Sequence, residues 1–209
     1  MPSQPITKYQ FKKLLRLTRE EKNKFIAQRD ELFYRILWTL GFRPSEARLI
    51  KISEINFHEK TIFIPAENNK ERNSDNFPIT FFLRFRIKRY IKKIPFKTEW
   101  LFPCYLNIQK QKDNPVIIFQ MERKFSERMK TLGELHESSS YKDGKRKMHN
   151  LNLYSFRKHF GTKVYLKTNC PKKTASMLRQ TDPELKAVWS YVFMAEKEQR
   201  RGILNKISF

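Results

Sequence analysis

Arg157 is the first residue whose setting suggests chemistry. It lies within residues 151–167, where Phe156, Phe160 and Val164 recur every four residues; they therefore stack on one face and predict a helix. Arg157 lies at the edge of that face.

A guanidinium on a buried helix keeps its proton and presents a rigid fork of donors, which suits a bound phosphate. The alternative interpretation is a surface arginine on an amphipathic helix.

A second arginine, Arg43, has an equally specific setting far upstream. An apolar helical stripe ends at Leu40, Gly41 is a natural helix stop, and Pro44 suits the first position of the next helix. Arg43 therefore lies at a corner between two helices. The residue before a proline is excluded from helical geometry, and the N–H groups at the start of the next helix are unpaired. These features predict an anion site.

Both arginines lie in segments that resemble a known family. Gly-Phe-Arg-Pro-Ser-Glu at residues 41–46 resembles the first-arginine motif of the tyrosine recombinases (phage integrases). Tyr154-Ser-Phe-Arg157 resembles their His-x-x-Arg box, but it has Tyr154 where the family most often has histidine. The motifs occur in the family's order and separation, and the resemblance extends from Ile6 to Met194. It implies a fold like the catalytic domain of a tyrosine recombinase.

The resemblance also implies a catalytic lysine on a β-hairpin. Lys70, in the turn between the second and third predicted strands, is the preferred candidate, and Lys60 is a competitor. A lysine in a turn is otherwise simply solvated. Glu46, three residues after Arg43, is expected to support the arginine corner rather than to react.

Gln180 occupies the position where the family commonly places a histidine or tryptophan that touches the phosphate. A glutamine can still donate a hydrogen bond there. Arg179, one residue earlier, is the alternative occupant and would add charge. Without a role in the site, Gln180 would be an ordinary polar residue at a helix C-terminus.

Tyr191 is the predicted nucleophile, because it is the only tyrosine in residues 183–209. Strict family spacing falls on Trp189, which is no nucleophile, so the prediction assumes a two-residue insertion. The alternative is a core aromatic residue, since Val188 and Val192 supply an apolar face beside Tyr191.

The chemistry that the resemblance implies is two successive transesterifications. The tyrosine oxygen attacks a DNA phosphate and leaves a 3′-phosphotyrosyl bond and a free 5′-hydroxyl, which later attacks the partner strand. No cofactor is consumed, because the covalent intermediate stores the bond energy. Arg43 and Arg157 would hold the non-bridging oxygens, and Lys70 would protonate the leaving 5′-oxygen. Tyr154 would assist proton transfer or hold the phosphate through its hydroxyl.

The composition agrees with a polyanionic partner. Forty-four Lys and Arg residues against 21 Asp and Glu give a formal net charge of +23, and double-stranded DNA is the expected partner. The sequence has neither an apolar run long enough to span a bilayer nor a signal-peptide pattern, so a cytoplasmic, DNA-associated protein is expected. Cys104, Cys170 and four histidines show no metal-ligand spacing, so no metal site is predicted.

We expect one catalytic domain over residues 1–209, with a core at about 6–194 and a charged tail at 195–209. The predicted fold class is mixed α+β, mainly helical, with a small three-stranded antiparallel sheet. The predicted helices are residues 6–18, 20–40, 81–93, 116–132, 151–167, 171–180 and 183–194, the predicted strands are 53–57, 61–65 and 77–80, and residues 134–150 are predicted to form a mobile basic loop.

Three functions remain open from the sequence. The first is a site-specific recombinase of the short kind that consists of a catalytic domain alone, which would assemble as a dimer to tetramer on DNA. The second is a DNA-binding protein on the same fold without strand transfer, which the unusual Tyr154 and Gln180 favour. The third is a type IB topoisomerase-like enzyme that relaxes DNA without pairing two duplexes.

Overall fold

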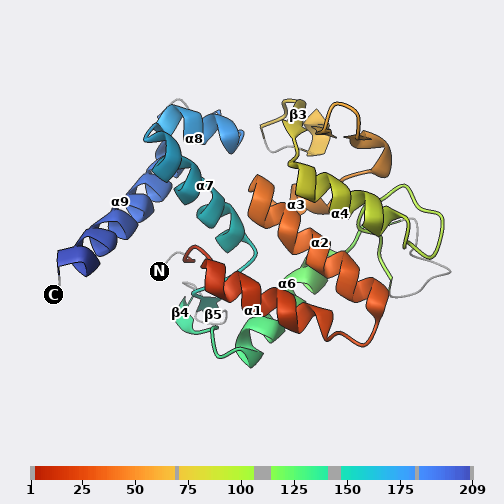
Figure 1. The fold of residues 1–209 in the computed structure, drawn as a ribbon, viewed down its shortest axis with the longest axis horizontal. Helices are drawn as coiled ribbons and strands as arrows, with labels where there is room; N and C mark the ends of the chain where they lie inside the picture. The colour runs from red at the N-terminus through yellow and green to blue at the C-terminus, as the bar shows by residue number, and fades with distance from the viewer. Residues whose placement is uncertain (1–2, 69–70, 106–113, 141–146, 182–183, 208–209) are drawn as a thin grey trace.

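The computed structural model describes residues 3–68, 71–105, 114–140, 147–181 and 184–207 (Figure 1). It confirms the predicted fold class: a mostly helical chain with a three-stranded antiparallel sheet in the order β1-β2-β3. The helices are α1 (Lys8–Arg19), α2 (Lys24–Leu40), α3 (Pro44–Arg48), α4 (Phe81–Ile91), α6 (Ile118–Thr131), α7 (Tyr154–Thr168), α8 (Pro171–Met177) and α9 (Lys186–Ile207). The strands are β1 (Ile55–Asn56), β2 (Thr61–Ile64), β3 (Asp75–Pro78), β4 (Glu137–Ser140) and β5 (Lys147–His149).

Local capping chemistry sets the ends of the first two helices. Thr7 and Gln10 form a reciprocal capping box at the start of α1, with bonds of 3.2 and 2.9 Å. The predicted helix 20–40 begins later, at Lys24, because the side chain of Asn23 accepts the free N–H groups of the first turn. Gly41 ends α2 in the left-handed region, with φ of 63°.

Helix α2 is the centre of the core and packs against α1, α4 and α7 (Figure 1). Its Tyr34 is fully buried and stacks on Phe156 of α7 at 5.8 Å between ring centroids. Nearby, the His159 ring stacks on Trp38 at 3.7 Å. These aromatic contacts hold α7, and with it Arg157, against the end of α2.

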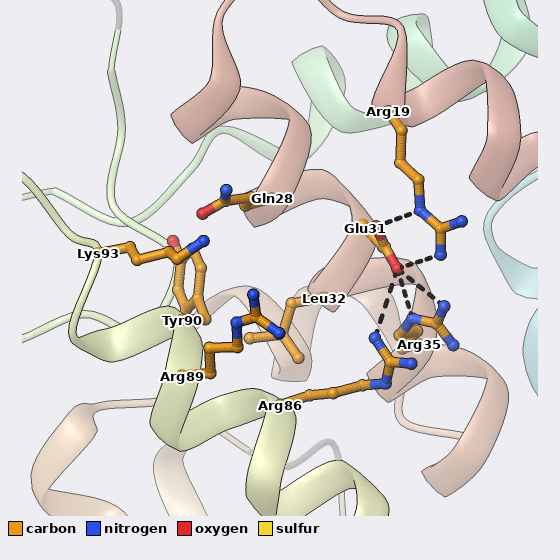
Figure 2. A pocket seen from close by; sticks show the side chains of 9 residues that line it. All are labelled: Arg19, Gln28, Glu31, Leu32, Arg35, Arg86, Arg89, Tyr90 and Lys93. Carbon is orange, nitrogen blue, oxygen red and sulfur yellow. Dashed lines mark hydrogen bonds and ion pairs between the residues drawn. The ribbon is translucent and has the colours of Figure 1, made fainter.

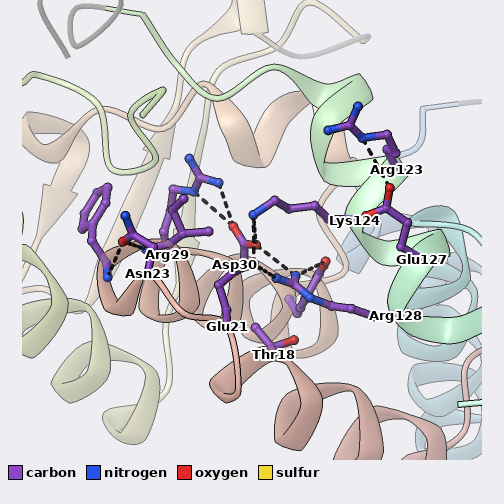
Figure 3. A network of polar contacts seen from close by, with 12 residues as sticks. Thr18, Glu21, Asn23, Arg29, Asp30, Arg123, Lys124, Glu127 and Arg128 are labelled. Carbon is purple, nitrogen blue, oxygen red and sulfur yellow. Dashed lines mark hydrogen bonds and ion pairs between the residues drawn. The ribbon is translucent and has the colours of Figure 1, made fainter. Parts of the chain in front are cut away.

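A buried charge network joins α2 to α6 (Figure 3). Asp30 of α2 is fully buried and accepts hydrogen bonds from Arg29 and Arg128, each at 2.9 Å. Arg128 also donates to the Tyr34 hydroxyl at 3.1 Å, and Lys124 lies 3.7 Å from Asp30. The buried carboxylate is thus neutralised by cations from two helices.

The structure corrects three predictions. Strand β3 begins at Asp75 rather than Phe77, because its pairing with β2 extends to Ile64. Residues 134–150, predicted as a loop, contain the antiparallel pair β4 and β5, whose ladder satisfies backbone groups that a loop would leave to water; residues 141–146 lie outside the described chain.

The third correction concerns the C-terminal segment. Helix α9 begins at Lys186 and continues to Ile207, so residues 195–207 of the predicted tail are helical. Figure 1 shows α9 extending away from the rest of the molecule beyond α7. No helix in the described ranges is both long and apolar enough to cross a membrane.

Candidate active site

Arg43 lies at the corner between α2 and α3, as predicted from the sequence. Its extended backbone precedes Pro44, the first residue of α3, and only 9% of the residue is exposed. Its Nη1 donates to Glu46 Oε1 at 2.7 Å, and its backbone N–H donates to Glu46 Oε2 at 3.1 Å. Glu46, which is 2% exposed, therefore fixes both the backbone and the guanidinium of Arg43.

Arg157 is buried where three elements meet. Its Nη1 donates to the carbonyl of Gly41 at 2.8 Å, and its Nη2 donates to the carbonyl of Leu178 at 2.5 Å. These carbonyls belong to the C-cap residues of α2 and α8, where the helix dipole places partial negative charge. Burial, followed by repulsion from the Arg43 guanidinium, lowers the pKa of Arg157 to about 10. The side chain still carries its charge at neutral pH.

Arg179 completes a group of three arginines. It follows α8 with a left-handed φ of 51°, and its Nη2 donates to Glu46 Oε2 at 2.5 Å. Its guanidinium carbon lies 4.3 Å from the Phe42 ring centroid, a cation–π contact. Its buried Nε and Nη1 have no hydrogen-bond partner among the described residues. One carboxylate, that of Glu46, thus serves two arginines, and donors remain for a further anion.

Of the two residues proposed for this position, Arg179 is the one that contacts the Arg43 corner. Gln180 is partly buried, and its Oε1 is buried with no described partner. The reason lies in the backbone: α8 ends at Met177, and the left-handed conformation of Arg179 itself, two residues later, directs its side chain towards Glu46.

Glu71 was not expected from the sequence to belong to this site. Its Oε1 accepts from Arg43 Nη2 at 3.1 Å, and its Oε2 accepts from the Thr181 hydroxyl at 2.6 Å. The carboxylate therefore occupies an anion position between Arg43 and Thr181. A single glutamate in a turn-rich segment carries no pattern that marks it, so only the folded chain could identify it.

Tyr191 faces the arginines from α9. It is 7% exposed, and its ring packs on Gly161 of α7 so closely that a Cβ there would lie 2.9 Å from Tyr191 Cγ. Tyr191 lies close enough to Arg157 to be one of the groups that raise the pKa of that arginine. Trp189, by contrast, is 55% exposed. The helix turns Tyr191, and not Trp189, towards Arg157. Tyr191 also packs with Val188 and Val192, as the alternative core interpretation expected.

Three other residues were predicted or considered for the site: Tyr154, Lys70 and Lys60. Tyr154, in the first turn of α7, is 45% exposed and so is not part of the buried arginine group. Lys70 lies outside the described residues, next to Glu71. Lys60 is exposed in the turn before β2, with φ of 61°. No group of three or more metal-ligating side chains occurs in the part of the chain that the structure describes.

Comparison with known proteins identifies the family of this chain. The sequence profile of the phage integrase family matches residues 4–178, which include both motif arginines. The chain belongs to the phage integrase family. The matched region ends just before Arg179 and leaves Tyr191 outside it.

Individual relatives are more distant. The tyrosine recombinase XerA of Pyrococcus horikoshii is 27% identical over 117 residues, which is 54% of this chain and 40% of XerA. The structure of the XerH site-specific recombinase bound to palindromic difH substrate has a TM-score of 0.70 at 17% identity, covering 96% of this chain and 52% of that one. The Tn1549 transposon integrase in complex with transposon right end DNA has a TM-score of 0.66 at 17% identity, covering 96% and 66%. This phage integrase chain thus has the recombinase fold and spans between 40% and 66% of the length of these three proteins.

Proposed function

We propose that this chain is the catalytic domain of a site-specific tyrosine recombinase, which cuts and rejoins double-stranded DNA through a 3′-phosphotyrosyl bond to Tyr191. The observation that carries the proposal is the convergence of Arg43, Arg157 and Arg179 with a tyrosine at one buried site. Family membership and the DNA complexes of XerH and the Tn1549 integrase support it. Such a role would place the protein with DNA in the cytoplasm.

The arginines would bind the phosphate that is cut. Glu46 holds Arg43 and Arg179 in place before DNA arrives, so these guanidiniums need little rearrangement to meet the non-bridging oxygens. The phosphate would displace the Glu71 carboxylate from Arg43, because both are anions that compete for Nη2. Arg157, held by two carbonyls, would offset charge that grows in the pentacoordinate transition state.

In the first step the Tyr191 oxygen would attack the phosphorus, its proton would pass to solvent water, and the bond to the 5′-oxygen would break. Lys70 would give that oxygen a proton, leaving a free 5′-hydroxyl. Attack by the 5′-hydroxyl of a partner strand would then reverse these transfers and release Tyr191. Tyr154, exposed at the rim, would contribute a hydroxyl to the bound phosphate. Exchange between two duplexes requires at least two copies, so we expect self-association on DNA.

The test uses a nicked suicide substrate, which traps the covalent intermediate because the cut strand diffuses away. Wild-type protein should form a denaturant-resistant DNA adduct, and digestion should leave a nucleotide on the peptide that contains Tyr191. Tyr191→Phe keeps the aromatic ring against Gly161 and should bind DNA without forming an adduct. Trp189→Phe, two residues away and exposed, is the matched control and should still form it.

Each outcome has one meaning. An adduct that persists in Tyr191→Phe would place the nucleophile elsewhere. No adduct from the wild type on any cognate site would favour the non-catalytic DNA-binding protein. An adduct together with relaxation of supercoiled DNA, but without joining of two duplexes, would favour the topoisomerase-like enzyme.

A further inference from the structure

A cavity of about 250 Å³ lies between the end of α1, the middle of α2 and α4, among residues with no role in the candidate active site (Figure 2). We call it the basic pocket. Five of its lining residues are cations and one is a carboxylate: Arg19, Arg35, Arg86, Arg89, Lys93 and Glu31. The volume is below that of usual small-molecule sites, about 300–1,000 Å³, and suits small anionic groups.

The charges in the basic pocket do not balance. Glu31 accepts two bonds from Arg19 and one from Arg35, each of 2.8 Å, and Arg86 reaches across from α4 to 3.7 Å. Figure 2 shows these guanidiniums gathered around the single carboxylate. Burial, together with repulsion from Arg35, lowers the pKa of Arg86. The pocket therefore holds cations that repel one another without enough negative charge to offset them.

Arg89 of α4 and Lys93, two residues beyond the end of that helix, extend this excess. Arg86 and Arg89 lie three residues apart on one side of α4, and Lys93 lines the same pocket from the turn that follows the helix. Neither Arg89 nor Lys93 forms an ion pair with a carboxylate in the described part of the chain. Their donors are available to a ligand.

Tyr90 lies on the core side of the basic pocket. It lines the basic pocket, is 4% exposed, and its buried hydroxyl has no hydrogen-bond partner among the described residues. Burial raises the pKa of Tyr90 above its ordinary value, so the hydroxyl keeps its proton and can donate it. The hydroxyl is closed off from the cavity, and the charges that act on it are those of Arg29 and Asp30, so a ligand in the basic pocket would meet the Tyr90 ring.

We propose that the basic pocket is a second phosphate-binding site, distinct from the arginine group around Glu46, which takes the phosphates of a DNA backbone or of a free polyphosphate. Guanidinium forks match the paired oxygens of a phosphate, and the basic pocket holds more cations than its one carboxylate can neutralise. The site does not depend on strand cleavage by Tyr191. A protein without any covalent chemistry would still have it.

The test compares two double variants in α4 and the turn that follows it. Arg89→Gln/Lys93→Gln removes two cations that line the basic pocket, whereas Lys88→Gln/Lys92→Gln removes two exposed cations beside them that do not. Net charge falls equally in both. Arg19, Arg35 and Arg86 keep Glu31 neutralised, so both variants should fold, which circular dichroism would check.

Two measurements distinguish the source of the phosphate. Calorimetry with sodium tripolyphosphate tests the free ligand, and the pocket variant should bind at least about tenfold more weakly than the control if the ligand is a polyphosphate. A salt series of DNA affinity tests the backbone, and the slope of log K against log salt should fall by about one to two more in the pocket variant than in the control if DNA enters. A difference in either measurement supports the site and names its ligand. Equal behaviour of the two variants in both would overturn it, because only net charge would then matter.

The result is separable from the proposed recombinase activity. If no adduct forms but the pocket variant binds phosphate or DNA differently from the control, the second site is supported and the recombinase proposal is not. Normal adduct formation, together with equal phosphate and DNA binding by the two double variants, would refute the second site and support the recombinase.

Discussion

Glu46→Gln should destabilise the protein more than any other single change that preserves the shape of a side chain in the candidate active site. Glu46 is 2% exposed and accepts bonds from Arg43 at 2.7 and 3.1 Å and from Arg179 at 2.5 Å. The amide would remove the buried negative charge and point an N–H₂ group at arginine donors. Breaking a buried ion pair on one side costs about 3–5 kcal/mol, and we expect the free energy of unfolding to fall by that amount.

Glu71→Gln is the matched control, because it removes a carboxylate from the same Arg43. The Glu71 side chain is 23% exposed and its contact with Arg43 is 3.1 Å, so screening by water should limit the loss to about 1 kcal/mol or less. Urea unfolding followed by circular dichroism gives both values, and the midpoint should shift while the m-value stays constant. Added phosphate should raise the midpoint of Glu46→Gln more than that of wild type, because an anion bound to the uncompensated arginines stabilises the folded state.

Equal losses in the two variants would refute this reasoning, since they would show that Glu46 is not the principal counter-charge of the arginines. A phosphate effect no larger in Glu46→Gln than in wild type would show that the arginines do not form one anion site.

Three further substitutions test other parts of the structure. Gly161→Ala should lower the yield of the DNA adduct at least about tenfold with little change in DNA affinity, because the new Cβ would lie 2.9 Å from Tyr191 Cγ and displace the ring. A normal adduct yield would contradict the packing of α9 on α7. Asp30→Asn should lower the free energy of unfolding by about 3–5 kcal/mol in urea titrations, because it removes the buried carboxylate that Arg29 and Arg128 share. A loss below about 1 kcal/mol would contradict the importance of this network. Burial lowers the pKa of His159 from 6.5 to about 4, so its neutral form stabilises the fold fully above pH 6.5 and this effect is lost as the pH falls towards 4. Between pH 6.5 and pH 4 the free energy of unfolding should fall by about 2 kcal/mol less in His159→Gln than in wild type. An equal fall in the two proteins would mean that His159 titrates normally.

Local sequence was sufficient for the parts of the site that depend on neighbouring residues. Gly41 and Pro44 predict the corner that holds Arg43, because a left-handed helix end and a proline start act within a few residues. The spacing from Arg43 to Glu46 predicts their contact for the same reason. The helix that carries Arg157 and the three-stranded sheet also follow from short-range periodicity.

Tertiary structure alone decided which distant groups meet these residues. Arg157 is held by the carbonyls of Gly41 and Leu178, positions that no local pattern connects with it. The left-handed turn at Arg179, and the rotation of α9 that brings Tyr191 rather than Trp189 to Gly161, depend on how α7, α8 and α9 pack. A buried charge adopts whichever partner the packed chain brings within hydrogen-bond distance, since leaving it unpaired costs more than a local preference can supply.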